Sequence, residues 1–364
     1  MKLIRLLFIG ILFPLILEAQ HTPKYSNEFL SIGAGARALG LSGAFVAAAA
    51  DATSGYWNPA GLTGIKAKFQ LALMHSEYFA GLAKYDFGSF SARLDQKSVL
   101  GITVIRFGVD DIPDTSELID ANGNINYDRI KSFSAIDNAF LISYSRQINN
   151  NFRLGGNLKI IYRKVGDFAK AWGFGLDAGA QYRKGKWQMG AVLRDASSTF
   201  NAWSFSLSET QRKAFISTNN IIPENTLERT APSFIFGLAR EFSVGKKIGI
   251  LPELDFQTTF DGMRSTLIKD QQFSISPSLG LEINFNRMIF LRGGIGNFSS
   301  GTDPNGQERM VTYRPNLGLG LQFKGVSLDY ALTNVGASAL YSNVFSLNFE
   351  IGSLNPNNSE RGDD

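Results

Sequence analysis

The chain offers few residues that could catalyse a reaction or bind a metal ion. Its 364 residues include 2 histidines, His21 and His75, and no cysteine. Ser76 follows His75, but nucleophilic catalysis needs a serine, a histidine and an orienting polar group that meet in space, and no nucleophile motif accompanies this pair. The sequence therefore predicts a protein that is not an enzyme and that holds neither a metal ion nor a cofactor.

Oxygen-bearing side chains alternate along the segment from Asp120 to Asp128, as they do in a calcium-binding loop. Such a loop has glycine at its sixth position and glutamate at its twelfth, where this chain has Ile125 and Lys131. Turns rich in Asn and Asp show the same alternation, because their side chains bond to nearby backbone groups. We predict no metal site here, and calcium is the alternative that the segment leaves open.

The longest stretch without strand periodicity, residues 195–230, is rich in large apolar side chains. A loop with this much apolar surface folds over its neighbours, meets a partner or dips toward lipid. A lid packed on the protein's own rim is the alternative. We predict that five residues of this loop contact a partner or a ligand: Trp203, Phe205, Phe215, Ile221 and Ile222.

The elements that position these residues are expected to be β-strands, because side-chain character alternates with a period of two from about Ile65 onward. A helix would scatter such side chains around its circumference, whereas a strand sorts them onto two faces. Aromatic residues stand at both ends of the apolar faces, as aromatic girdles at two lipid–water boundaries require. The clearest apolar face consists of Trp172, Phe174, Leu176, Ala178, Ala180 and Tyr182.

Fourteen such segments follow one another, most of them about as long as a tilted membrane strand. Their connections alternate between short turns and longer loops, and the long loops 110–133, 195–230, 261–271 and 300–310 all fall in one set. Barrels with periplasmic turns and external loops show this alternation. We predict an all-β fold, a transmembrane antiparallel β-barrel of about 14 strands over residues 65–351, in the outer membrane of a Gram-negative bacterium. The segments are 65–75, 81–94, 97–109, 134–148, 152–166, 171–184, 186–194, 231–242, 247–260, 272–285, 287–299, 311–323, 325–336 and 341–351.

The two ends of the chain differ from the strands. Lys2 and Arg5 precede an apolar run from Leu6 to Leu17, which predicts a secretory signal peptide over residues 1–19. Residues 352–364 form a polar tail, and no later stretch approaches the ~18 apolar residues of a membrane helix. The net charge is +4 without a long basic run, so we expect outer-membrane lipid and no nucleic acid as a partner.

Residues 20–64 predict a plug, or hatch, inside the barrel. Small residues dominate from Gly33 to Ala50 and allow close packing, and a 14-strand barrel is too wide for its own side chains to fill. Asn58 is a good N-cap for a helix that starts with proline. An Ala-rich helix packed against a sheet is the alternative. The plug motif consists of Gly33, Gly35, Arg37, Gly40, Gly43, Asp51, Asn58, Pro59 and Ala60.

The plug sequence resembles the opening of the PorV/PorQ family. The similar stretches are FLSIGAGARALG from Phe29, GAFV from Gly43, DAT from Asp51 and WNPAGL from Trp57. Proteins of that family look like relatives of the fatty-acid channel FadL, whose hatch carries a similar Asn-Pro-Ala. The resemblance implies a 14-strand outer-membrane barrel and a link to the type IX secretion system, in which PorV-like members escort cargo proteins.

Two functions follow from these expectations. In the first, the external loops bind secretion-system proteins or secreted cargo while the lumen stays plugged. The alternative is a FadL-like passive channel for long-chain fatty acids or other hydrophobic small molecules, opened by hatch movement at the plug glycines. Fold alone does not choose between them.

Overall fold

The computed structural model describes residues 26–118, 124–302, 309–334 and 341–353. The predicted signal peptide, His21, part of the Asp120–Asp128 segment and nearly all of the predicted tail lie outside the described residues.

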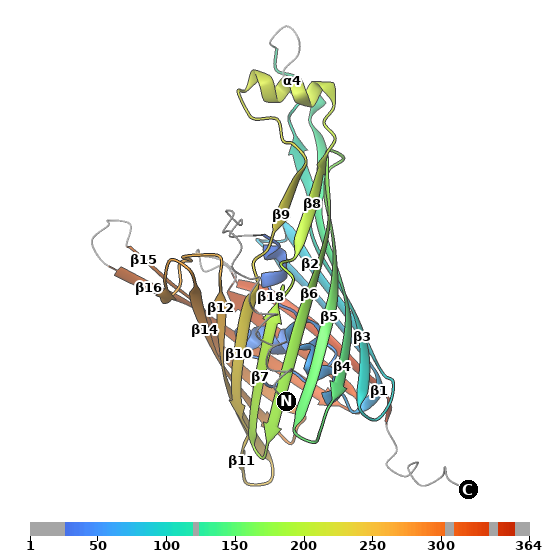
Figure 1. Cartoon of the computed structure of the whole chain (residues 1–364), viewed down its shortest axis with the longest axis vertical. Helices are drawn as coiled ribbons and strands as arrows, with labels where there is room; N and C mark the ends of the chain where they lie inside the picture. Colours follow the sequence, from blue (N-terminus) through green and yellow to red (C-terminus); the bar gives the residue numbers. More distant parts are fainter. Residues whose placement is uncertain (1–25, 119–123, 303–308, 335–340, 354–364) are drawn as a thin grey trace, which may run out of the picture.

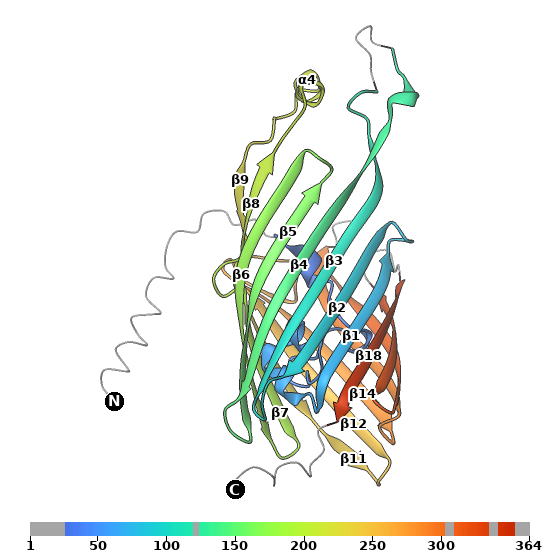
Figure 2. The same cartoon turned by 90° about the vertical axis from the view of Figure 1, so that its right-hand side faces the viewer.

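The described residues form one antiparallel sheet of 18 strands, and 14 of these strands make the wall of a barrel (Figures 1 and 2). The first and last strands pair from Ala67 opposite Ser353 to Ser76 opposite Val344, which closes the cylinder. Closure leaves no free edge in the wall, as a sheet in hydrocarbon requires. The predicted fold class is confirmed. The wall strands are β1 (Ala67–Tyr78), β2 (Ala83–Arg93), β3 (Ser98–Asp114), β4 (Lys131–Gln147), β5 (Phe152–Val165), β6 (Ala169–Lys184), β7 (Trp187–Arg194), β10 (Ser233–Arg240), β12 (Ile248–Thr259), β14 (Ser274–Phe285), β15 (Ile289–Thr302), β16 (Arg309–Phe323), β17 (Val326–Asn334) and β18 (Tyr341–Ser353).

The wall is apolar outside and polar inside, as the alternation predicts. On β6, Trp172, Phe174 and Leu176 are 50%, 45% and 48% exposed on the outer face, whereas Asp177 is buried on the inner face. An apolar outer band and a polar lumen are what a membrane barrel needs. Among the described residues, no helix is long and apolar enough to cross a membrane.

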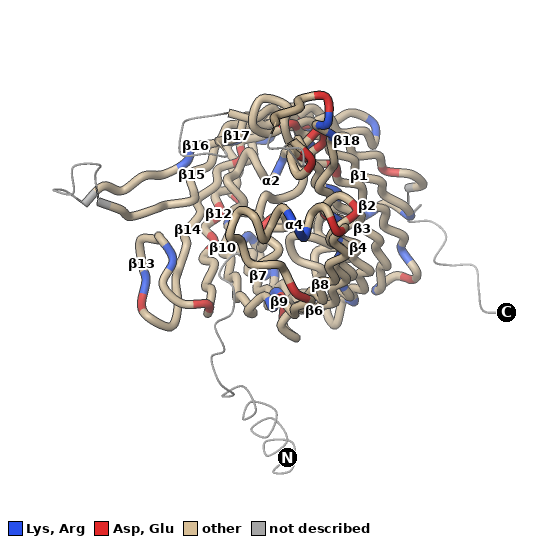
Figure 3. Tube along the Cα trace, turned by 90° about the horizontal axis from the view of Figure 1, so that it is seen from above, with Lys and Arg blue, Asp and Glu red and all other residues tan. Residues whose placement is uncertain are grey.

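The predicted loop 195–230 is not irregular, which corrects the sequence interpretation. It contains β8 (Phe200–Phe205), α4 (Glu209–Ser217) and β9 (Thr226–Arg229), and β8 pairs with the upper half of β6. Backbone pairing therefore continues the wall upward as a one-sided extension. The extension holds α4 well above the mouth (Figure 1), and from above α4 lies within the outline of the barrel (Figure 3).

Two other predicted loops are shorter than expected. The pairing of β3 with β4 continues past a bulge to Asp114 and Lys131, so the loop expected at 110–133 begins and ends later (Figure 2). Likewise β15 and β16 pair as far as Thr302 and Arg309. The remaining short elements are β11 (Phe242–Val244), β13 (Ile268–Lys269) and the 3₁₀ turn η4 (Tyr127–Arg129).

The N-terminal segment runs inside the barrel as a chain of short turns (Figures 1 and 2). Asn58 caps η3 by accepting a hydrogen bond from the Ala60 amide at 3.2 Å, and Pro59 is the first residue of that turn. Most residues from Ala34 to Thr63 are buried. The segment comprises η2 (Glu28–Ser31), α2 (Ala36–Gly40), α3 (Ser54–Trp57) and η3 (Pro59–Gly64).

Candidate functional site

The plug is joined to the wall by buried ion pairs. Arg37 Nε and Nη2 each lie 2.8 Å from a carboxylate oxygen of Glu282 on β14. Arg292 donates to the same carboxylate at 2.7 Å and to Asp329 at 2.7 Å. Asp51, on the plug, lies 3.8 Å from Arg37. The resulting network connects the plug to β14, β15 and β17, and every charge in it has an opposite partner, as burial demands.

Two neighbouring carboxylates on the inner face of β12 hold the plug backbone. Asp255 Oδ2 accepts from the amides of Phe45 and Val46 at 2.9 and 3.0 Å. Glu253 Oε1 accepts from the amide of Ala47 at 2.7 Å, and Glu253 also accepts from the next amide along the chain. Four consecutive N–H groups, which no helix or strand satisfies, are thereby paired.

Side-chain amides anchor the opposite side of the plug. Asn58 Nδ2 donates to the carbonyl groups of Val46 and Ala180, so this predicted motif residue links two plug segments to β6. Gln181 on β6 donates to the carbonyl oxygens of Val46, Ala47 and Ala49. The segment from residue 45 to 49 is therefore fixed on both its donor side and its acceptor side.

Glycines in the wall allow the plug backbone to lie directly against the strands. A Cβ atom on Gly190 would lie 2.4 Å from the Val46 carbonyl oxygen, and one on Gly179 would lie 2.3 Å from Asn58 Oδ1. Such distances are far below van der Waals contact, so no larger residue fits without movement of the plug.

The predicted hatch glycines fall into two groups. Gly33, Gly35 and Gly43 have φ values of +98°, +84° and +78°, a region in which residues with a Cβ are strained. Gly40 instead belongs to α2, and a Cβ there would lie 3.0 Å from Gly318 Cα in the wall. Three of the four glycines are thus backbone turning points, and the fourth is a point of close approach.

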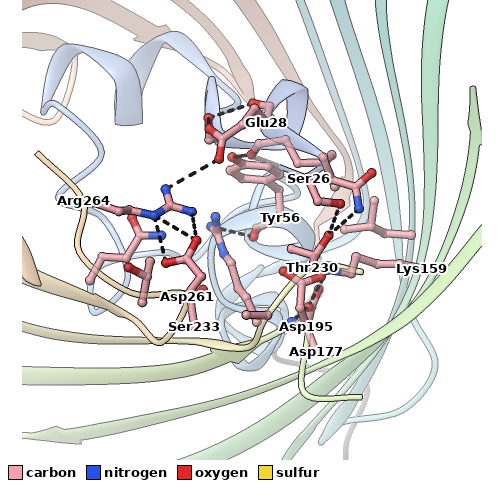
Figure 4. A pocket seen from close by; sticks show the side chains of 18 residues that line it. Ser26, Glu28, Tyr56, Lys159, Asp177, Asp195, Thr230, Ser233, Asp261 and Arg264 are labelled. Carbon is pink, nitrogen blue, oxygen red and sulfur yellow. Dashed lines mark hydrogen bonds and ion pairs between the residues drawn. The ribbon is translucent and has the colours of Figure 1, made fainter. Parts of the chain in front are cut away.

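A polar cavity of about 100 Å³ lies where the plug meets the barrel mouth (Figure 4). Lys159 in its wall pairs with Asp177 at 2.9 Å and also with Asp195, and Arg264 pairs with Asp261. A second cavity of about 320 Å³ continues between the plug and strands β10 to β17. Arg194 and Tyr56 line both cavities, so the two spaces meet at these side chains.

An apolar groove of about 440 Å³ lies on the extension above this mouth. Two predicted ligand residues, Trp203 and Phe205, line it, and their rings stack with centroids 6.1 Å apart. Register places Trp203 opposite Ala171 and Phe205 opposite Ala169, on the strand face that becomes the lumen wall lower down. The groove is completed by Val165, Phe168, Ala169, Thr226, Leu227 and Glu228.

The other three predicted loop residues lie elsewhere. Phe215 is on α4, and Ile221 and Ile222 follow that helix. Ile221 is 91% exposed, so it contacts little of the protein itself. The structure therefore divides the predicted set between a groove in the wall and the tip of the extension.

Among the described residues considered for chemistry, His75 and Ser76 do not come together as a catalytic pair. His75 is exposed and lies 2.7 Å from Asp86, while the neighbouring Ser76 is buried and donates to the Asn343 carbonyl group. Adjacent residues of a strand point to opposite faces, so this serine and histidine cannot work as a pair. No group of three or more metal-ligating side chains occurs among the described residues.

Sequence reasoning missed the partners of the plug. Glu253, Asp255 and Glu282 are all buried on the inner face of the wall, and the folding of the barrel brings them to the plug. The available signal was their position inside predicted membrane strands, because an ionisable group there is costly and needs a partner.

Comparison with known proteins shows which solved structures have a similar fold. No family model matches the chain, and no curated protein matches it in sequence. Solved structures do resemble it. The Ralstonia pickettii toluene transporter TbuX aligns with a TM-score of 0.56 and 13% identity, over 88% of this chain and 98% of that chain. The CymD monoaromatic hydrocarbon channel aligns with a TM-score of 0.54 and 14% identity, over 88% and 98%. A Pseudomonas aeruginosa FadL homologue aligns with a TM-score of 0.53 and 12% identity, over 87% and 98%.

The architecture is that of an outer-membrane β-barrel with an internal plug. Its fold is similar to that of the solved hydrocarbon channels and of the FadL homologue. These comparisons do not support the narrower PorV/PorQ resemblance or the link to type IX secretion.

Proposed function

We propose that this protein is a passive outer-membrane channel for apolar small molecules, which was the second of the two functions considered from the sequence. The observation that carries the proposal is the apolar groove at Trp203 and Phe205. It lies on the extracellular extension and on the face that leads into the lumen. Concave apolar sites of this size bind small apolar ligands.

The proposed route inward runs from the apolar groove to the mouth cavity and then to the second cavity between plug and wall. An apolar molecule leaves the groove beside Trp203, where the Arg163 guanidinium lies 5.0 Å from the ring centroid and also faces the plug residue Phe29 at 5.9 Å. It then reaches the mouth cavity and the space between plug and wall. The similar solved structures, described as toluene or monoaromatic hydrocarbon channels, support this choice of ligand class.

Passage beyond these cavities requires the plug to move. Residues 20–64 act as a hatch inside the barrel of residues 65–351, after removal of the signal peptide at 1–19. Gly33, Gly35 and Gly43 are the turning points, and Arg37, Asp51 and the Asn58-Pro59-Ala60 unit hold the closed position.

Uptake by whole cells tests the proposal. Cells that lack the gene are compared with complemented cells for entry of labelled toluene and a labelled long-chain fatty acid. We expect the Trp203→Ala/Phe205→Ala double variant to fall toward the deletion level. The matched control is Trp172→Ala, an aromatic on the lipid-facing side of the same paired strands. Uptake that does not depend on the gene for either solute rejects the proposal.

A second candidate is the secretion-linked scaffold. Exposed apolar residues in the connections above the barrel mouth favour it, namely Tyr127 between β3 and β4 (71% exposed), and Ile216 (67%) and Ile221 (91%) on the extension. Purification in mild detergent tests this candidate. Recovery of the protein alone, together with normal export in a deletion strain, rejects it.

A further inference from the structure

The short connections at one end of the barrel are strongly basic. They lie between β2 and β3, β4 and β5, β6 and β7, β10 and β12, β14 and β15, and β16 and β17. Because barrels place short turns on the periplasmic side, this end faces the periplasm. The acidic residues of these turns are Asp95 and Glu241, whereas the basic ones are Lys97, Lys186, Lys246, Lys247, Arg287 and Lys324.

One part of this rim has the form of a site. Trp187 begins β7 and is directly opposite Lys184 on β6 and directly opposite Arg240 on β10. The indole therefore lies between two cations on the outer face of the wall. Since neighbouring strands are about 4.8 Å apart, the two flanking positions are about 10 Å from each other.

The Arg240 guanidinium is held by aromatic rings. Its central carbon lies 4.8 Å from the Trp187 ring centroid and 4.9 Å from that of Phe242. Cation–π contact with two rings positions the guanidinium at the rim, and its N–H groups are the donors that would bind an oxyanion.

This pair of cations has no carboxylate partner in the part of the chain that the structure describes. Neither Lys184 nor Arg240 belongs to an ion pair among the residues that the structure describes. Glu241 lines a cavity on the lumen side with Arg183 and Gln188 instead. Two exposed cations thus flank an aromatic ring at the membrane boundary, and no described residue forms an ion pair with either of them.

The next row of residues toward the bilayer is apolar. Met189 on β7 is opposite Tyr182 on β6 and Leu238 on β10. Tyr182 and Met189 are 40% and 39% exposed on the lipid-facing side. An amphiphile whose phosphate meets the cations would lay its acyl chains along this row.

We propose that Lys184, Trp187 and Arg240 form a binding site for the head group of an anionic glycerophospholipid in the inner leaflet of the outer membrane. The two cations contact the phosphate and the indole lies at head-group depth, where Trp is favoured in membranes. The site is independent of the proposed transport function, because it faces lipid and not the lumen.

Lipid binding to the purified full chain in a neutral detergent tests the proposal. Phosphatidylglycerol and phosphatidylcholine are titrated separately, and bound lipid is counted by native mass spectrometry. We expect a preference for phosphatidylglycerol that weakens with added salt. In the Lys184→Gln/Arg240→Gln variant, the affinity for phosphatidylglycerol should fall by about fivefold per cation removed. That factor is equivalent to about 1 kcal/mol.

The matched control is Lys170→Gln, an exposed lysine at the other end of the same strand, β6. This control should retain the wild-type preference. All variants are first checked for folding by the gel-mobility shift between boiled and unboiled samples. Equal binding of the two lipids by the wild type, or an unchanged preference in the double variant, overturns the proposal. So does an equal loss in Lys170→Gln, or an acidic periplasmic protein that is retained in place of lipid.

Discussion

Arg37 on the plug and Glu282 on strand β14 form a two-pronged ion pair inside the barrel, with both N···O distances at 2.8 Å. Two hydrogen bonds from one guanidinium to one carboxylate fix both the orientation of the guanidinium plane and its distance from the carboxylate. The pair ties α2 of the plug to the wall, so its loss should weaken the closed position.

We predict that Arg37→Gln destabilises the folded barrel by about 3 kcal/mol, the lower end of the range for breaking a buried pair. The lower end applies because Arg292 remains 2.7 Å from Glu282 and still neutralises it. Urea unfolding in detergent measures the loss. Lys164→Gln breaks the exposed pair with Asp167 and is the control, with an expected effect below about 1 kcal/mol. Equal effects of the two substitutions would contradict the argument.

The wall could be predicted from the sequence because membrane strands are repetitive and local. Each of the fourteen predicted segments overlaps one wall strand, since alternation directly reports which side chains meet lipid. The extension was missed because Phe200 to Phe205 and Thr226 to Arg229 are short and lie above the membrane, where no apolar band imposes a pattern.

The plug illustrates a different limit. Its small residues and the Asn58-Pro59 cap are local signals, and they predicted a compact segment. Its anchoring depends on contacts with Gln181, Glu253 and Asp255, which are more than 130 residues away from their backbone partners. Contacts of that kind depend on barrel register, which the alternation of a single strand does not specify.

The turn between β2 and β3 is expected to make a pH-dependent contribution to the stability of the folded state. Asp95 accepts hydrogen bonds from the amides of Lys97 and Ser98 at 2.6 and 2.7 Å, and the Lys97 bond is the main cause that lowers the pKa of this carboxyl. A lowered pKa in the folded state means that the stabilisation is present above the unfolded value of ~3.9 and is lost as the pH falls through the folded value.

We therefore predict that Asp95→Asn lowers the unfolding temperature at neutral pH, and that this difference from the wild type disappears in strong acid. Thermal unfolding at a series of pH values from 7 downward is the measurement. A difference that stays constant as the pH is lowered would show that the charged form of Asp95 plays no part.

The Asp255 carboxylate should hold the plug in its closed position. Asp255→Ala leaves the amides of Phe45 and Val46 without their acceptor, and each buried donor left unpaired costs about 1–3 kcal/mol. For two donors we expect a loss of stability on the order of 2–6 kcal/mol and more frequent opening events in planar bilayers. Asp167→Ala, which removes an exposed carboxylate, is the control. If the Asp255→Ala variant conducts like the wild type, Asp255 does not hold the plug closed.

The contact between Gly190 on β7 and the plug gives the most direct test of the hatch. A methyl group on residue 190 would lie 2.4 Å from the Val46 carbonyl oxygen, which belongs to backbone that Gln181 and Asn58 also hold. The wall cannot yield easily, because its strands are paired on both sides, so the plug must shift. We predict that Gly190→Ala costs about 1–3 kcal/mol of stability and raises the conductance of the reconstituted channel.

The control for this substitution is Gly293→Ala on β15, where the nearest heavy atom to the new methyl group is 4.0 Å away. Both variants add one methyl group to a wall glycine and remove the same backbone freedom, so they differ mainly in what the methyl group meets. If the plug closes the pore by lying directly on the strand backbone, only the substitution at residue 190 should change conductance. Equal conductance in both variants and the wild type would mean that the segment near Val46 does not control the pore.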